Sequence, residues 1–172
     1  MAREAARRCE LERVLFIPAG RPPHKSAGPY APYADRLRMV ELATAGEPRF
    51  EASTLEEGDG ASYTIDTIAK LRPALKPSDE LFFLIGADAF AEIESWRQWL
   101  DVVRAVEFIV VSRPRHRYEI PPQARVHRLD GLELPTSSSD IRKKVANGNF
   151  DIDVPPAVLE YIKKYGLYAR SG

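Results

Sequence analysis

The chain has 172 residues, enough for one domain with a sizeable core, and its 25 Lys and Arg residues balance its 25 Asp and Glu residues, so net charge does not suggest a nucleic-acid or membrane partner. No apolar run approaches the roughly 20 residues that cross a bilayer, and residues 1–13 lack a signal-peptide pattern. Cys9 is the only cysteine, which excludes an internal disulfide and a cysteine metal cluster. We therefore expect a soluble, cytoplasmic, globular protein.

The pattern of apolar residues predicts an α/β fold. In chain order it indicates a helix over 2–10, a strand over 13–18, a helix over 33–45, a short strand over 50–54, a helix over 62–71, a strand over 81–85, helical pieces over 89–93 and 99–105, strands over 108–111 and 126–129, and helices over 138–147 and 156–165. The apolar runs at 14–17 and 81–85 are typical of fully buried strands. Apolar strands that alternate with helices predict a parallel sheet covered on both faces.

Ligands of such folds bind beyond the carboxyl ends of the strands, and the first segment there is a cationic loop. Gly20, Pro22 and Pro23 stiffen it, and Arg21, His24 and Lys25 project from it. Cationic side chains on a rigid loop suit an anionic small molecule such as a phosphate. A Pro-rich surface turn with ordinary solvated charges is the alternative, and the local sequence leaves both open.

The second segment follows the strand at 81–85. Gly86 would allow a ligand to approach the backbone. Asp88 is predicted at or near a helix start, where its carboxylate either accepts a hydrogen bond from a ribose hydroxyl or caps the helix.

The third segment is Thr136-Ser-Ser-Ser-Asp-Ile-Arg142, at the start of a predicted helix. Hydroxyl groups and backbone N–H groups gather there, and Arg142 lies about one turn inside the helix, an arrangement that suits a phosphate group. The alternative is a capping box that pairs Ser137 with Asp140. Three consecutive serines exceed what a cap requires.

Two aromatic residues could stack on a flat ring: Tyr63, just before a helical stretch, and Trp96, at a break between two helical pieces. Half-buried packing is the more common role of such residues, and we expect it for Trp99. His24, His116 and His127 are far apart and lack metal-ligand spacing. The sequence offers no support for covalent catalysis.

Taken together and in this order, these segments resemble the bacterial nicotinate-nucleotide adenylyltransferases. The resemblance covers nearly the whole chain. It rests on Phe16-Ile-Pro-Ala-Gly-Arg-Pro-Pro-His-Lys25, Ser62-Tyr-Thr64, Phe83-Leu-Ile-Gly-Ala-Asp88, Trp96, Val111-Ser-Arg-Pro114, Ser137-Ser-Ser-Asp-Ile-Arg142 and the ending at 154–168. It implies a Rossmann-like, doubly wound parallel sheet of the nucleotidyltransferase type. Residues 1–172 would form a single domain, with 150–168 as its C-terminal helical segment.

The resemblance also implies a reaction and a site. Nicotinate mononucleotide would attack the α-phosphate of ATP, giving nicotinate adenine dinucleotide and pyrophosphate in NAD biosynthesis, with Mg²⁺ held through the substrate phosphates and no protein metal site. The resemblance implies that Tyr63 and Trp96 contact the nicotinate ring, that Thr64 lies at the ring carboxylate, and that His24 and Lys25 lie near the mononucleotide and phosphates. It implies that Gly86 and Asp88 lie at the ribose and Arg113 on the adenosine side. Ser137, Ser138 and Arg142 would bind the ATP phosphates, where Ser138 and Arg142 would stabilise the reacting phosphate.

The chain departs from the family pattern at its start. The family normally begins with a strand, a Gly-Gly-Thr-Phe-Asp-Pro loop and a His-x-Gly-His pair, and none of these is present in this sequence. The strand would be the first, central one of the sheet, beside the strand at 13–18, and the histidine pair stabilises the phosphates during transfer. We therefore expect the natural protein to begin upstream and turnover to depend on that segment.

Two other functions remain open from the sequence. One is a non-catalytic module that binds a pyridine mononucleotide, which keeps the aromatic pair and the His24–Lys25 loop without the reactive histidines. The other is a related adenylyltransferase with another phosphate acceptor such as phosphopantetheine. Tyr63 and Trp96 argue against the latter, because a flexible acceptor needs no aromatic sandwich. The sequence decides neither the preference for the acid over the amide mononucleotide nor whether the chain forms a homo-oligomer.

Overall fold

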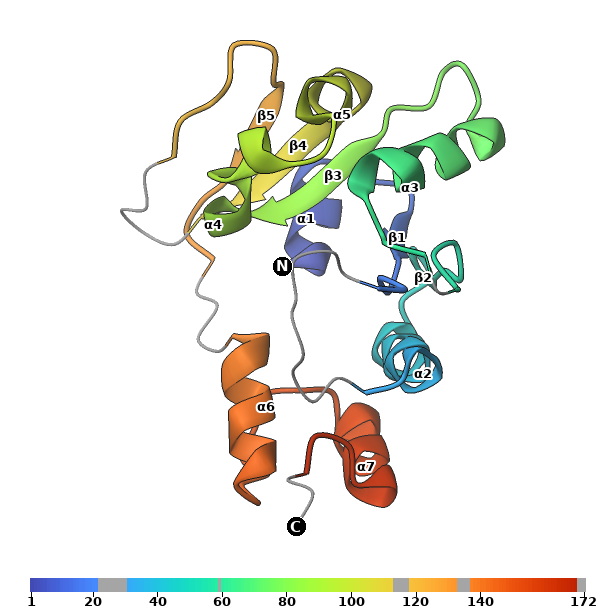
Figure 1. Ribbon diagram of the computed structural model, residues 1–172, viewed down its shortest axis with the longest axis vertical. Helices are drawn as coiled ribbons and strands as arrows, with labels where there is room; N and C mark the ends of the chain where they lie inside the picture. Colours follow the sequence, from blue (N-terminus) through green and yellow to red (C-terminus); the bar gives the residue numbers. More distant parts are fainter. Residues whose placement is uncertain (22–30, 59, 113–117, 133–136, 170–172) are drawn as a thin grey trace. The chain divides into compact units, whose positions relative to one another are not determined.

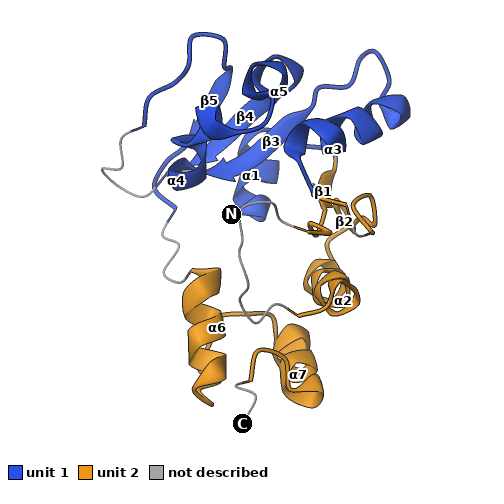
Figure 2. Ribbon diagram, viewed as in Figure 1, with its two compact units in different colours: residues 1–12, 62–134 blue, residues 13–61, 135–172 orange. Residues whose placement is uncertain are grey.

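The computed structural model describes residues 1–21, 31–58, 60–112, 118–132 and 137–169. The chain divides into two compact units, each built from two separate stretches (Figure 2). Unit 1 takes residues 1–12 and 62–134, and unit 2 takes residues 13–61 and 135–172. The prediction of a single domain over residues 1–172 stays a prediction.

Unit 1 is a three-stranded parallel sheet with helices on its two faces (Figure 1). The strands are β3 (Phe82–Gly86), β4 (Glu107–Val111) and β5 (Val126–Leu129), in the order β3-β4-β5. The helical elements are α1 (Ala2–Arg8), α3 (Thr64–Leu71), η1 (Arg72–Ala74), α4 (Ala87–Phe90), η2 (Ile93–Ser95) and α5 (Trp99–Ala105).

The alternation of side chains along β4 divides the core of unit 1 into two clusters. Phe108 and Val110 belong to the cluster that includes residues of α3, α4 and α5, whereas Ile109 and Val111 pack with Ala5 of α1. Successive side chains of a strand point to opposite faces, so an apolar run without alternation requires cover on both sides. The prediction of a parallel sheet covered on both faces is confirmed in unit 1.

Unit 2 holds a second parallel pair and a helical cluster. β1 (Val14–Phe16) pairs with β2 (Phe50–Ala52), and α2 (Tyr33–Thr44) connects them. The remaining helices are α6 (Ser138–Ala146) and α7 (Pro156–Tyr165). Their buried residues Val145, Val158 and Ile162 pack together with apolar side chains of α2 and of residues 150–168. Helix α7 ends at Gly166, whose φ of 60° favours glycine.

The predicted elements correspond closely to these helices and strands, but one expectation about burial is wrong. The run at 14–17 was expected to be fully buried, whereas β1 is half-buried along its length, and in β3 only Ile85 is buried. Within the described residues, β1 pairs with β2 alone and β3 with β4 alone, whereas β4 has a strand on each side. The burial of a strand therefore depends on its position in the sheet, because an edge strand has a neighbouring strand on one side only.

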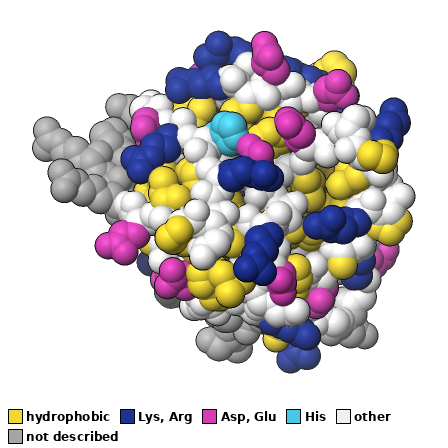
Figure 3. All heavy atoms as spheres, turned by 90° about the horizontal axis from the view of Figure 1, so that it is seen from above, with side chains coloured by type: hydrophobic (Ala, Val, Ile, Leu, Met, Phe, Trp, Pro, Cys, Tyr) yellow, Lys and Arg dark blue, Asp and Glu magenta, His cyan; other side chains and the backbone are white. Residues whose placement is uncertain are grey.

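No helix among the described residues is long and apolar enough to cross a membrane. The face in Figure 3 carries basic and acidic side chains interspersed with apolar ones. Among the described residues, Glu107 contacts Arg125 at 2.9 Å and His127 at 2.7 Å.

Candidate functional site

The carboxyl edge of the unit 1 sheet brings together three segments that are far apart in the sequence. Gly86 of β3, Val111 of β4 and Leu129 of β5 lie in one row of the parallel register. Directly beyond the row, the buried Ser112 donates a short hydrogen bond from its hydroxyl group to the carboxylate of Asp130. The register thus places the Gly86 segment level with the start of the Val111–Pro114 motif, as a nucleotide site at this edge requires.

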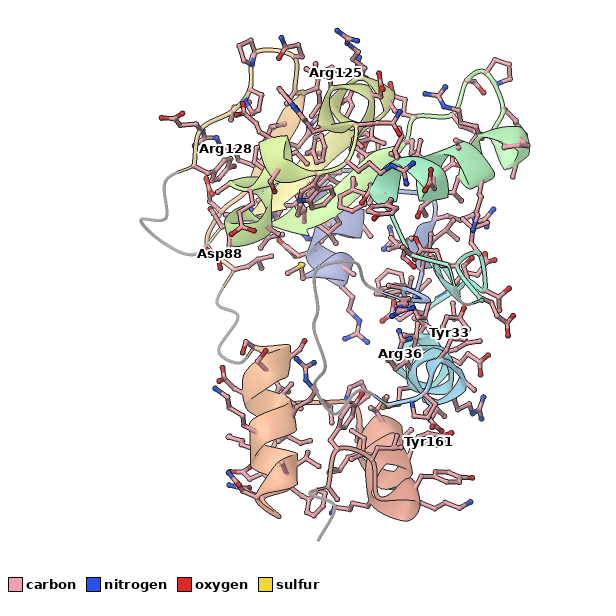
Figure 4. The ribbon with its side chains drawn as sticks, viewed as in Figure 1. Tyr33, Arg36, Asp88, Arg125, Arg128 and Tyr161 are labelled. Atoms are coloured by element: carbon pink, nitrogen blue, oxygen red, sulfur yellow. The ribbon has the colours of Figure 1, made fainter. Side chains whose placement is uncertain are left out.

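Gly86 and Asp88 open α4 at this edge. Gly86 is the N-cap residue, and a Cβ atom added there would meet no atom within 4 Å, so a ligand can approach its backbone. Asp88 is exposed in the first turn of α4 (Figure 4). Gly86 takes the N-cap position and Asp88 lies in the first turn of α4, so the capping alternative for Asp88 also stays a prediction. The prediction that its carboxylate accepts a ribose hydroxyl stays open.

The two aromatic positions are linked by a residue that the sequence did not single out, Arg97. Tyr63 is the N-cap of α3 and is half-buried, and the Arg97 guanidinium carbon lies 4.7 Å from the centroid of its ring. Trp96, next to Arg97, occupies the predicted break between η2 and α5, and its ring meets that of Phe83 edge-on at 5.8 Å. Trp96 and Trp99 both pack partly against the core, as expected for Trp99.

Thr64 is the first residue of α3, directly after Tyr63. The first N–H groups of a helix have no partner within the helix. The backbone at Thr64 therefore suits an anion that approaches this end of α3 beside the Tyr63 ring.

The serine segment of unit 2 forms the capping box that the sequence offered as one alternative. The Ser137 hydroxyl oxygen accepts from the Asp140 backbone N–H at 3.1 Å, and the Ser137 backbone N–H donates to the Asp140 carboxylate at 3.4 Å. Ser138 and Ser139 are exposed on the first turn, and the Arg142 guanidinium donates to the Ser139 hydroxyl at 3.2 Å. The box engages Ser137 and Asp140. Ser138 and Arg142 lie with the box on the first two turns of α6, so the phosphate prediction stays open for Ser137, Ser138 and Arg142.

Other residues surround this helix end within unit 2. Burial raises the pKa of the Tyr168 phenol, and the positive charges of Arg142 and Arg36 act against that rise. Arg36 of α2 donates to three backbone carbonyls, those of Ala31, Ala19 and Gly20, at 3.1, 2.5 and 3.0 Å. The last two belong to the predicted cationic segment. His24, Lys25 and Arg113 lie outside the described residues.

Three residues described above were not predicted from the sequence: Asp130, Arg36 and Arg97. The sequence nevertheless contains a signal for the first two. Asp130 directly follows the strand predicted at 126–129, so an acid at a carboxyl end was visible. Arg36 lies four residues before Val40 in the predicted helix at 33–45, so the two share one helix face, and a cation beside an apolar residue there needs partners. Arg97 adjoins Trp96, but nothing in the sequence indicated its contact with Tyr63.

Among the described residues, no group of three or more His, Cys, Asp and Glu side chains is placed to hold a metal ion. The candidate site instead offers N–H, hydroxyl and guanidinium donors. Such donors fit phosphate oxygens and not a bare cation.

Comparison with known proteins identifies relatives of this chain. A family model described as Cytidylyltransferase-like matches residues 1–144. A probable nicotinate-nucleotide adenylyltransferase of Solibacter usitatus is 59% identical over 167 residues, covering 97% of this chain and 89% of the relative. The one from Pelobacter propionicus is 38% identical over 196 residues, covering 99% and 90%.

Solved structures show the same fold. Plasmodium falciparum nicotinic acid mononucleotide adenylyltransferase complexed with NaAD matches with a TM-score of 0.71 at 21% identity, covering 92% of this chain and 83% of that one. The same enzyme complexed with APC matches with a TM-score of 0.69 at 20% identity. Fold and comparisons thus define a nucleotidyltransferase of the cytidylyltransferase-like class. Within that class, the chain belongs to the nicotinate-nucleotide adenylyltransferase family.

Proposed function

We propose that this chain transfers AMP from ATP to nicotinate mononucleotide, giving nicotinate adenine dinucleotide and pyrophosphate. The observation that carries the proposal is the 59% identity to the Solibacter usitatus relative over 97% of this chain, a span that contains every segment of the candidate site. The carboxyl edge of the β3-β4-β5 sheet supports it, because nucleotides bind at this edge in open α/β sheets. Cytoplasmic location is proposed with it, from the single cysteine and the composition.

The aromatic pair would hold the pyridine ring. Tyr63 and Trp96 are half-buried residues of unit 1, connected through Arg97, and aromatic faces at that depth suit a flat heterocycle. The backbone N–H groups at Thr64 would meet the ring carboxylate. His24 and Lys25 would lie near the mononucleotide phosphate, and Gly86 and Asp88 at the ribose of the dinucleotide, with Arg113 on the adenosine side.

The α6 helix start would hold the ATP phosphates. Ser137, Ser138 and Arg142 combine a positive helix end, hydroxyl donors and a guanidinium. In the transfer, a phosphate oxygen of the mononucleotide attacks the α-phosphorus of ATP, and the bond to the leaving pyrophosphate breaks. The protein's part is to align the two phosphates and neutralise their charge. Mg²⁺ is proposed to bind through the substrate phosphates, where it would neutralise further charge, and we assign no side chain to it.

Two measurements test the proposal separately. Pyrophosphate release from ATP and nicotinate mononucleotide with Mg²⁺ reports turnover, and isothermal titration calorimetry with each mononucleotide reports binding without turnover. We expect saturable binding of nicotinate mononucleotide by this chain, and pyrophosphate release that depends on the mononucleotide once the strand and histidine segment of the family pattern are added upstream. Binding without release by that extended chain would favour a non-catalytic pyridine-mononucleotide module. Absence of binding would refute the proposal.

A further inference from the structure

Arg36 of α2 connects the two sides of the stretch at 21–30, which carries the predicted cations (Figure 4). Its guanidinium donates to the carbonyls of Ala19 and Gly20 at 2.5 and 3.0 Å, directly before this stretch. It also donates to the carbonyl of Ala31 at 3.1 Å, directly after it. One planar group thus holds residues 19–20 and residue 31 side by side.

The Arg36 guanidinium is itself fixed in place within unit 2. It is partly buried, each of its three nitrogens donates to a carbonyl, and its carbon lies 5.4 Å from the centroid of the Tyr33 ring. The start of the stretch has a second attachment, because Arg21 forms a parallel bridge with Ala61. Both ends of the stretch are therefore joined to the folded part of unit 2.

Stabilisation of α2 does not by itself require acceptors on both sides of one stretch. Arg38, on the same helix, pairs with Glu41 at 2.7 Å, one turn further along. The acceptors of Arg36 lie outside α2, and bonds that join the ends of a loop restrict every residue between them. Cations in a loop that is restricted in advance bind an anion more tightly, because less ordering remains to be done on binding.

We propose that Arg36 is a positioning residue for the phosphate of the mononucleotide, and that it acts by holding the two ends of the 21–30 stretch together. The inference rests on the proposed function, in which His24 and Lys25 of this stretch lie near that phosphate. Arg36 acts without contact to the ligand, since its nitrogens already donate to carbonyls. Its effect is therefore confined to ligands that carry the phosphate.

The test compares nicotinate mononucleotide with nicotinate riboside, the same ligand without the phosphate. Calorimetry gives Kd for the mononucleotide, and displacement of the mononucleotide gives Kd for the riboside. Arg36→Lys keeps the charge but offers one ammonium group to three carbonyls. We expect it to weaken mononucleotide binding about tenfold, the value of one hydrogen bond to a charged group, and to leave riboside binding within about twofold.

A double-mutant cycle with Lys25→Gln tests whether Arg36 acts through the stretch. Lys25→Gln alone is also expected to weaken only the mononucleotide, about tenfold. Once Lys25 is replaced, Arg36→Lys is expected to add a factor of about three or less, because one of the cations that it positions has gone. Two full effects that simply multiply would overturn the inference.

Ile162→Val is the matched control for stability. Ile162 lies in α7, is 3% exposed and packs with Val145 and Val158 in unit 2. Loss of its buried methyl group destabilises the same unit without altering a bond to the stretch. With both variants folded by circular dichroism, we expect wild-type Kd values for both ligands in this control. A loss of mononucleotide binding equal to that of Arg36→Lys would overturn the inference, because instability would explain both.

The outcomes separate this inference from the function on which it rests. Equal weakening of mononucleotide and riboside by Arg36→Lys, or no weakening of either, overturns the inference, while mononucleotide binding by the wild type keeps the proposed function. A wild type that binds both ligands equally tightly also overturns it, because the phosphate would then have no contact to position. If the wild type binds neither ligand, the proposed function fails, and the inference fails with it.

Discussion

Replacement of Arg36 by methionine is expected to destabilise unit 2 more than the replacement of an ordinary residue on a surface-facing helix would. Its guanidinium donates to three backbone carbonyls, and one of them belongs to the buried residue Ala31 (Figure 4 shows Arg36 and Tyr33). A hydrogen bond from a charged group contributes about 1.5–3 kcal/mol. Because bonds from one group are not additive and water can reach part of this site, we expect a total loss of about 2–4 kcal/mol in the free energy of unfolding.

The assay is urea unfolding followed by circular dichroism, with comparison of the midpoints at constant slope. Arg38→Met is the matched control, since Arg38 lies on the same helix, is 54% exposed and pairs only with Glu41 among the contacts seen here. We expect the control to lose less than about 1 kcal/mol. Arg36→Lys, which has one ammonium group for three carbonyls, should fall between the two. Equal midpoints for Arg36→Met and Arg38→Met would refute the reasoning.

Three further predictions concern a charge, a cap and a ring. Arg7 and Arg8 lower the pKa of Glu4 from 4.5 to about 2. Stability from this group is therefore present above pH 4.5 and lost as pH falls towards 2, so thermal melts of Glu4→Gln and wild type should differ at neutral pH and converge in acid. Ser137→Ala should cost about 1 kcal/mol by removing the N-cap of α6, measured by chemical unfolding, with Ser138→Ala near wild type. Trp96→Ala should raise KM for nicotinate mononucleotide about tenfold or more through lost stacking, and an unchanged KM would remove Trp96 from the site.

The order of elements could be predicted from the sequence, because each apolar run and helix start carries a local signal. The apolar run at 108–111 shows the limit of that signal. Its neighbours decide its burial, and β4 is buried because strands flank it on both sides, whereas the equally apolar β1 is half-buried. A run of apolar residues indicates a strand but not its place in the sheet.

The residues of the candidate site fall into two groups, those that a local sequence pattern predicts and those that depend on tertiary contacts. Gly86, Trp96 and Ser137 were predicted from local patterns, and the structure places them at a strand end, a helix break and an N-cap. The contact of Arg97 with Tyr63 and the three acceptors of Arg36 depend on tertiary contacts between separate elements. Only the folded chain could reveal these.

The alternation of the two units along the chain has a consequence for synthesis. Unit 1 opens with residues 1–12 and resumes at Ser62, whereas unit 2 starts at Arg13 and resumes at Pro135. No single cut separates them, so neither can be expressed as one continuous fragment. On the ribosome, α1 must wait until β4 has emerged to bury Ala5, and α2 must wait for α7. Folding of both units therefore proceeds late and through contacts of long sequence separation, a topology that slows folding and leaves apolar surface exposed to chaperones meanwhile.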